Sequence, residues 1–219
     1  MHPIYDSFCR APSFWVTSSH PRFDWRRDAL TEWTRIGEIS LLQIQTGVLT
    51  GRGSYDTGML VPVDSLRLTP DGVLGFSDGE WVADRHHRDH PAAKRWHAED
   101  VLSFGFTSHY DFMWELFRKT PLGIAGENVI VVAERMINPG DIGGGVRIET
   151  NEGPIEMGMP EVLEPCVEFT RFMTSRPEAS AREINPDREK LRNGVRGYAV
   201  GIPNPIEVGL GDFVSIRMV

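Results

Sequence analysis

The class of fold is decided by two related stretches of sequence, residues 139–150 (PGDIGGGVRIET) and residues 210–219 (LGDFVSIRMV). In each, a Gly-Asp pair precedes a run that is rich in β-branched residues. Glycine permits the backbone angles of a tight turn, and aspartate can close the turn by accepting hydrogen bonds from the next amides. The two stretches are therefore predicted to be equivalent turns, each leading into a strand of a barrel or sheet.

Most of the remaining chain also has the patterns of strands and turns. Strands are predicted over residues 39–49, 129–132, 155–163 and 196–202, where β-branched and apolar residues lie between turn signals. Helices are predicted over residues 109–119 and 167–173, and residues 176–193 are predicted to be an exposed excursion with some helix. The fold class is thus mixed α+β, rich in strand.

The composition is that of an ordinary folded protein. The chain has 219 residues, of which 40% are hydrophobic and 25% are charged, with 22 glycines and 15 prolines. This mixture excludes a disordered chain, a collagen-like repeat and a coiled coil, and the length is enough to bury a core. We expect residues 1–36 to form an N-terminal accessory segment with a short helix over residues 25–36, and residues 37–219 to form the main domain.

The charge balance and the cysteine content limit the partners and the compartment. Thirty-one acidic residues against 23 basic ones give a formal net charge of −8, which repels nucleic acid but still allows a small anionic ligand in a local basic pocket. The chain has two cysteines, no long apolar run and no signal-peptide pattern. We therefore expect a cytoplasmic protein that contacts no membrane.

Cys166 is the first candidate for chemistry. It follows Pro165 and begins the apolar pattern of the helix predicted over residues 167–173. The free amides at the start of a helix favour an anion, which would lower the pKa of the thiol and make it a nucleophile or a ligand for a soft metal. A buried structural cysteine is the alternative.

Two polar segments are further candidates. Residues 84–90 (DRHHRDH) place His86 and His90 four positions apart, as in helical zinc sites, although a solvated basic loop whose arginines suit a phosphate is the alternative. Residues 123–128 (GIAGEN) form a glycine-rich turn before a strand. There Asn128 can present its amide to a ligand or can stabilise the turn.

Taken in order along the chain, these segments resemble the MOSC family, the domain found at the C-terminus of molybdenum-cofactor sulfurases and in stand-alone bacterial proteins. The resemblance runs from about residue 39 to residue 219. Its pieces are Asp84-Arg85-His86, Gly126-Glu127-Asn128-Val129, Pro139-Gly140-Asp141, Pro165-Cys166, Arg196-Gly197-Tyr198-Ala199-Val200 and Gly211-Asp212.

The resemblance implies a MOSC-like β-barrel with a few peripheral helices and a role around the molybdenum cofactor (molybdopterin) or in sulfur transfer. It implies that Cys166 is the catalytic residue and the molybdenum ligand, as the matching cysteine is in related reductases of N-hydroxylated bases. It further implies a cofactor-binding pocket, whose residues would be Arg85, His86, Glu127, Asn128 and Arg196. Since the chain has no flavin, haem or iron–sulfur motif, such a reductase needs an external electron-donor protein.

The sequence departs from the family pattern beside the cysteine. The family often has an arginine there, whereas this chain has Leu163-Glu164-Pro165. An acidic Glu164 suits an anionic cofactor only if it points away or is protonated. The family also commonly has a glycine where this chain has Ala83.

Three other functions are compatible with these residues. A sulfur carrier would hold a persulfide on Cys166 for cofactor or metal–sulfur assembly and would need a sulfur-donor protein. A non-catalytic module would bind a small ligand and leave Cys166 inert. Zinc-dependent hydrolysis through His86, His87 and His90 is disfavoured, because the segment lacks a helical frame and a general base.

Overall fold

Strand β1 (Trp33–Gln45) is the strand on which the larger sheet is assembled. In the computed structural model, which describes residues 32–51, 53–93, 97–98, 101–119 and 121–218, β1 pairs with three strands in succession. Its first residues pair with β15 (Phe213–Arg217), its middle with β9 (Val129–Val131) and its end with β4 (Leu60–Pro62). A strand of 13 residues is long enough to serve all three.

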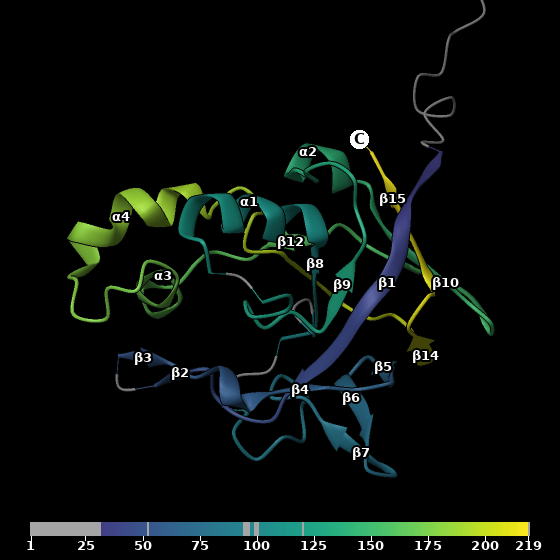
Figure 1. Ribbon diagram of the computed structural model, residues 1–219. Helices are drawn as coiled ribbons and strands as arrows, with labels where there is room; N and C mark the ends of the chain where they lie inside the picture. The colour runs from purple at the N-terminus through teal and green to yellow at the C-terminus, as the bar shows by residue number, and fades with distance from the viewer. Residues whose placement is uncertain (1–31, 52, 94–96, 99–100, 120, 219) are drawn as a thin grey trace, which may run out of the picture. The chain divides into compact units, whose positions relative to one another are not determined.

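The larger sheet has nine strands within the described residues and curls into a half-barrel (Figure 1). Its order is β11-β10-β15-β1-β9-β8-β13-β12, with β4 attached to β1. The strands not yet defined are β8 (Leu102–Phe106), β10 (Gly145–Thr150), β11 (Gly153–Met157), β12 (Glu161–Val162) and β13 (Tyr198–Val200). The predicted β-rich mixed fold is therefore confirmed.

A smaller sheet packs its apolar face into the same core. Its order is β14 (Ile206–Gly209), β5 (Ser65–Thr69), β6 (Gly72–Ser77) and β7 (Glu80–Ala83). Leu66, Leu68 and Val73 of this sheet are buried together with Ile44 of β1. A short hairpin of β2 (Thr50–Gly51) and β3 (Ser54–Tyr55), followed by the 3-10 turn η1 (Thr57–Met59), joins β1 to β4.

The helices lie at the periphery of the larger sheet, and three of the four described helices agree with predicted positions, whereas residues 139–142 form a short helix where a turn is predicted. They are α1 (Thr107–Phe117), α2 (Pro139–Ile142), α3 (Val167–Met173) and α4 (Ala181–Lys190). Met113 of α1 and Phe169 of α3 are buried against Ile130 of β9, whose neighbours Val129 and Val131 face the main core instead. Side chains alternate across a strand, so β9 is buried on both faces. None of the described helices has the length and apolar character needed to cross a bilayer.

The two predicted turns have the same hydrogen-bond geometry. The carboxylate of Asp141 accepts the amide of Asn138 at 2.8 Å, and the carboxylate of Asp212 accepts the amide of Gly209 at 2.8 Å. They precede β10 and β15, which are antiparallel neighbours in the larger sheet. The prediction that both turns lead into sheet strands is confirmed.

The helix predicted over residues 25–36 is wrong at its C-terminal end. Residues 33–36 begin β1, where Trp33 and Thr34 pair with Arg217 and Ile216 of β15. This non-local pairing supplies the backbone hydrogen bonds, so it overrides a local helical pattern. The rest of that helix lies outside the described residues, and the accessory segment predicted over residues 1–36 stays a prediction.

Substitution Gly72→Ala tests the contact that holds the loop after β7 against the smaller sheet. Gly72 has a φ of +134°, and an added Cβ would lie 2.5 Å from the Cα of His87. We expect the free energy of unfolding to fall by about 1–3 kcal/mol in urea denaturation, because both the backbone angle and the contact become strained.

Gly79→Ala is the matched control. Gly79 also has a positive φ (+87°), yet nothing lies within 4 Å of an added Cβ. Equal losses of stability in the two variants would mean that the approach of His87 contributes nothing.

Candidate functional site

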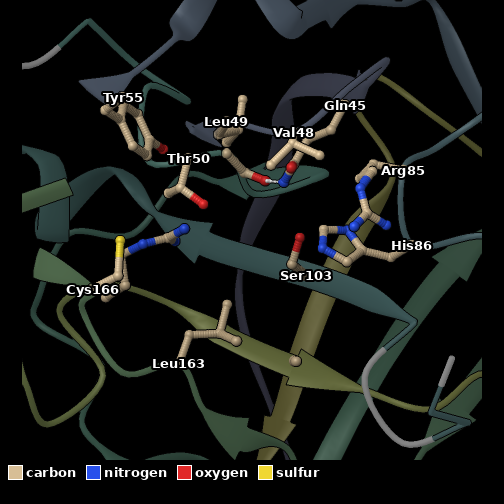
Figure 2. Close-up of a pocket in the computed structure, with 13 residues that line it drawn as sticks. Gln45, Val48, Leu49, Thr50, Tyr55, Arg85, His86, Ser103, Leu163 and Cys166 are labelled. Carbon is tan, nitrogen blue, oxygen red and sulfur yellow. Dashed lines mark hydrogen bonds between the residues drawn. The ribbon is translucent and has the colours of Figure 1, made fainter. Parts of the chain in front are cut away.

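A cavity of about 370 Å³ lies beside the sulfur of Cys166, and we call it the Cys166 cavity. Segments far apart in the sequence form its wall. The lining residues include Gln45, Tyr55, Arg85, His86, Ser103, Cys166 and Arg196. Figure 2 shows Tyr55 and Cys166 at one end of the cavity and Arg85 and His86 at the other. The cavity is therefore elongated, with a sulfur end and a cationic end.

A buried carboxylate, Asp84, organises the cationic end. Its Oδ2 accepts the backbone amide of Gln45 at 2.7 Å and the side-chain amide of Asn128 at 2.9 Å. Its Oδ1 accepts the backbone amide of His86 at 2.8 Å and lies 3.0 Å from the Nδ1 of the same residue. Burial alone would raise the pKa of Asp84, but the hydrogen bonds from His86 and Gln45 outweigh it and hold this pKa below its ordinary value.

Arg85 and His86 directly follow Asp84 in the sequence, and both side chains line the cavity. The backbone amide of Arg85 donates to the carbonyl of Gln45 at 2.7 Å, which fixes the loop against the end of β1. The Nε of Arg85 is buried and has no hydrogen-bond partner within the described residues. The side chain of His86 is 48% exposed, so its ring is accessible from the cavity mouth. The guanidinium of Arg85 lines the cavity and has further N–H donors for a ligand acceptor.

Arg196 is held at the sulfur end by a buried acid. Its Nη1 lies 3.5 Å from Oε1 of Glu127, and the hydroxyl of Tyr110 donates to Oε2 of Glu127 at 2.6 Å. Burial raises the pKa of Glu127, while Arg196 and Tyr110 act in the opposite direction. Arg196 therefore keeps its positive charge at the cavity surface, and Glu127, which does not line the cavity, is its acidic partner.

Glu127 and Asn128 lie behind the cavity, and neither is among the residues that line it. Both are about 1% exposed. Besides its bond to Asp84, Asn128 accepts the amide and hydroxyl of Ser103 at 3.1 and 2.8 Å. These contacts connect the cavity wall to β8, so the two predicted site residues support other side chains in this structure.

Cys166 is the N-cap residue of α3, as its position after Pro165 predicts. Its sulfur accepts the amide of Phe169 at 3.3 Å, and its carbonyl accepts the hydroxyl of Thr170 at 2.9 Å. The predicted lowering of its pKa is wrong: burial raises the pKa of the thiol, and Glu168 adds to this, whereas the amide of Phe169 and Arg196 offset only part of it. One amide of a short helix is weaker than the desolvation of the sulfur.

Glu164, the acidic departure beside the cysteine, points away from the cavity. Its carboxylate lies 3.0 Å from Nε of Arg192, its side chain is 64% exposed, and it is not a lining residue. The lining of the Cys166 cavity contains Arg85, His86 and Arg196 and no carboxylate. In a chain of net charge −8, this local excess of cations favours an anionic ligand.

The histidines of residues 84–90 do not gather around a common point. His87 and His90 use their Nδ1 atoms to accept the amides of Asp89 and Ala92 at 3.2 and 3.1 Å. In the part of the chain that the structure describes, no group of three or more His, Cys, Asp or Glu side chains is placed to hold a metal ion.

Several site residues have only a weak signal in the sequence. Gln43 and Gln45 are polar residues in an apolar strand, and their side-chain amides donate to the carbonyls of Gly123, Glu127 and Gly126 at 2.7–2.8 Å. A glutamine at alternate positions of a buried strand indicates such a role. Tyr55 and Ser103 give no comparable signal, because only tertiary structure brings them to the cavity.

Comparison with solved structures decides the fold. No protein-family model and no curated protein matches the sequence. The YuaD protein from Bacillus subtilis has a TM-score of 0.52 and 17% identity, and the match covers 86% of this chain and all of that one. The fold is MOSC-like. YiiM from Escherichia coli is also similar, with a TM-score of 0.46 and 14% identity over 83% of this chain and 69% of that one.

The MOSC-like fold brings together segments that the sequence resemblance only places in order. Arg85, Cys166 and Arg196 line one cavity although 81 and 30 residues separate neighbouring pairs. Similarity at this level of identity concerns the fold and not the role of the cavity.

Replacement Asp84→Asn tests the anchor of the cationic end. We expect the free energy of unfolding near pH 7 to fall by about 1–3 kcal/mol. In the variant, the side-chain NH2 group replaces one carboxylate oxygen, so the N–H groups that donate to that oxygen lose their acceptor. Since the pKa of Asp84 is lowered on folding, its stabilisation is complete above its ordinary value of 3.8 and is lost as the pH falls below it.

Urea denaturation of both proteins across this pH range is the measurement. The difference in stability between wild type and Asp84→Asn is expected to shrink below about pH 4. A difference that is constant from neutral to acidic pH contradicts a charged Asp84.

The raised pKa of Cys166 predicts slow alkylation. In a Cys9→Ser background Cys166 is the only thiol of the chain. At about pH 7.5 iodoacetamide is expected to react roughly tenfold more slowly than with free cysteine, with a rate that still rises above about pH 9, because only the thiolate reacts. Mass spectrometry follows the adduct, and a rate that levels off below neutral pH would contradict the raised pKa.

Proposed function

We propose that this chain is a MOSC-family protein that binds the molybdenum cofactor in the Cys166 cavity, with Cys166 as the molybdenum ligand. The observation that carries the proposal is the composition of the cavity wall, which combines a thiol with two arginines and no carboxylate. The volume of about 370 Å³ lies in the range of small-molecule and cofactor sites.

The residues present fit such a group. A thiolate is a soft ligand that suits molybdenum, and the Cys166 sulfur is at one end of the cavity (Figure 2). The guanidinium of Arg85 lines the other end of the cavity and suits phosphate oxygens. The cavity would therefore offer a soft ligand for a metal and cations for a phosphate within one site.

The chain's own residues have separate tasks in this proposal. Cys166 loses its proton when a metal binds, and the amide of Phe169 continues to donate to the sulfur. Arg196 lies by the same end and keeps its charge through Glu127. Asp84 fixes the loop that carries Arg85 and His86. When bound, the cofactor supplies oxygen-atom transfer and the reduction of N–O bonds, so we propose N-hydroxylated or N-oxygenated substrates and an external electron-donor protein.

The environment of Cys166 favours metal binding over sulfur carriage. A persulfide carrier must attack its donor as a thiolate. Burial raises the pKa of Cys166, so the thiol stays protonated until a ligand displaces the proton. A metal ion provides that displacement, whereas a sulfur donor does not.

The test is the molybdenum content per chain of protein from a host that makes the cofactor. We expect near-stoichiometric metal in the wild type and almost none in Cys166→Ala, because the only thiol among the lining residues of the cavity is lost. Arg85→Gln is expected to reduce the content partially, since it removes the charge at the other end.

Cys9→Ala is the matched control and should retain the metal. Thermal unfolding by circular dichroism verifies that each variant is folded. The absence of molybdenum from wild type, in cells shown to contain the cofactor, overturns the proposal. Mass spectrometry then separates the remaining functions, because a sulfur carrier gains the mass of one sulfur atom on Cys166 and a plain binding module does not.

A further inference from the structure

A second cavity of about 320 Å³ adjoins the sulfur end of the Cys166 cavity, and we call it the α3 cavity. Tyr55 lines both cavities, so one side chain separates them. The other residues that matter here are Lys119, Glu168, Arg171 and Phe172. Tyr55, the residue that the two cavities share, lies at the end of the first cavity that holds Cys166, opposite Arg85 (Figure 2).

Tyr55 is positioned by several contacts where the two cavities meet. Its hydroxyl donates to the carbonyl of Ile124 at 3.0 Å, and its ring lies 5.3 Å from the ring of Phe169 and 5.2 Å from that of Phe172. It belongs to the two-residue strand β3, which pairs only with β2 among the described strands. A ligand that spans the two cavities would therefore pass along an aromatic surface.

Two cations of the α3 cavity are positioned by neutral acceptors. Nζ of Lys119 donates to the carbonyl of Phe172 at 3.0 Å and lies 3.9 Å from the centre of its ring. Nε of Arg171 donates to the carbonyl of Ala179 at 2.7 Å. Neither has a carboxylate at ion-pair distance within the described residues, so both retain charge and further N–H donors for a ligand.

The charge and the surface of the α3 cavity select one class of ligand. Glu168 is the only carboxylate among its lining residues, so with Lys119 and Arg171 the net charge is +1. This charge suits a monoanion such as a carboxylate better than a phosphate dianion. The rings of Tyr55 and Phe172 suit a flat apolar body beside that carboxylate.

We infer that the α3 cavity binds the carboxylate of an aromatic substrate whose reacting group passes Tyr55 into the Cys166 cavity, with Lys119 and Arg171 as the recognition residues. Because this assignment rests on the proposed function, it defines the substrate as an N-hydroxylated compound that also carries a carboxylate. Lys119 and Arg171 determine specificity and take no part in the reaction itself.

The test compares two probes, benzamidoxime and its para-carboxylate, by isothermal titration calorimetry with the full-length protein. We expect wild type to bind the carboxylate roughly tenfold more tightly, as for one charge-assisted hydrogen bond. The double variant Lys119→Gln, Arg171→Gln should bind both probes equally. Equal binding by wild type, or a preference that survives in the double variant, overturns the inference.

Arg176→Gln is the matched control, because Arg176 is an exposed cation on the same connection, is paired with Asp187 at 3.7 Å and does not line the α3 cavity. It should keep the full preference. If the double variant does not fold, Lys119→Gln alone is used, and the preference should fall by about half on a logarithmic scale.

The same titration is repeated with protein from a host that lacks the cofactor, and metal content is measured on every sample. The preference should persist in the metal-free protein, because both cations belong to the chain. If wild type from the cofactor-making host contains no molybdenum but still prefers the carboxylate, that result contradicts the proposed function alone. A molybdenum-containing wild type without the preference contradicts the substrate class alone.

Discussion

The buried carboxylate of Asp84 joins the segments that form the cationic end of the Cys166 cavity. It accepts hydrogen bonds from the end of β1, from the loop that carries His86, and from Asn128, which in turn binds Ser103 of β8. Leaving any of these donors unpaired in the interior is costly, so the segments keep one arrangement. The cationic end of the cavity therefore depends on a residue that does not line it.

The two arginines of the cavity differ in how their charge is balanced. Arg196 is paired with Glu127, and Tyr110 binds the same carboxylate, so its charge is compensated inside the protein. Arg85 lines the cavity and has no carboxylate at ion-pair distance among the described residues, so its charge is available to a ligand in the cavity. This asymmetry gives an elongated cavity one strongly cationic end, far from Cys166 (Figure 2).

Sequence reasoning located the position of Cys166 correctly and its electrostatics incorrectly. The pattern after Pro165 predicts the start of a helix, and Cys166 is the N-cap of α3. The pKa depends on how deeply the sulfur is buried and on which charges surround it, and neither quantity is present in a local pattern. The same holds for Glu164, whose direction is set by Arg192 on a distant segment.

The sequence by itself determined the elements that follow from local patterns: the β-rich class, the two Gly-Asp turns before β10 and β15, helices α1 and α3, and the order of the MOSC-like motifs. These depend on side-chain periodicity and backbone preferences within a few residues. Tertiary structure alone decided that Trp33 belongs to a strand, that Glu127 and Asn128 stand behind the wall, and that Tyr55 separates two cavities. The reason is physical: strand pairing, burial and charge compensation involve residues that are distant in sequence, so their energies exist only once the chain is folded.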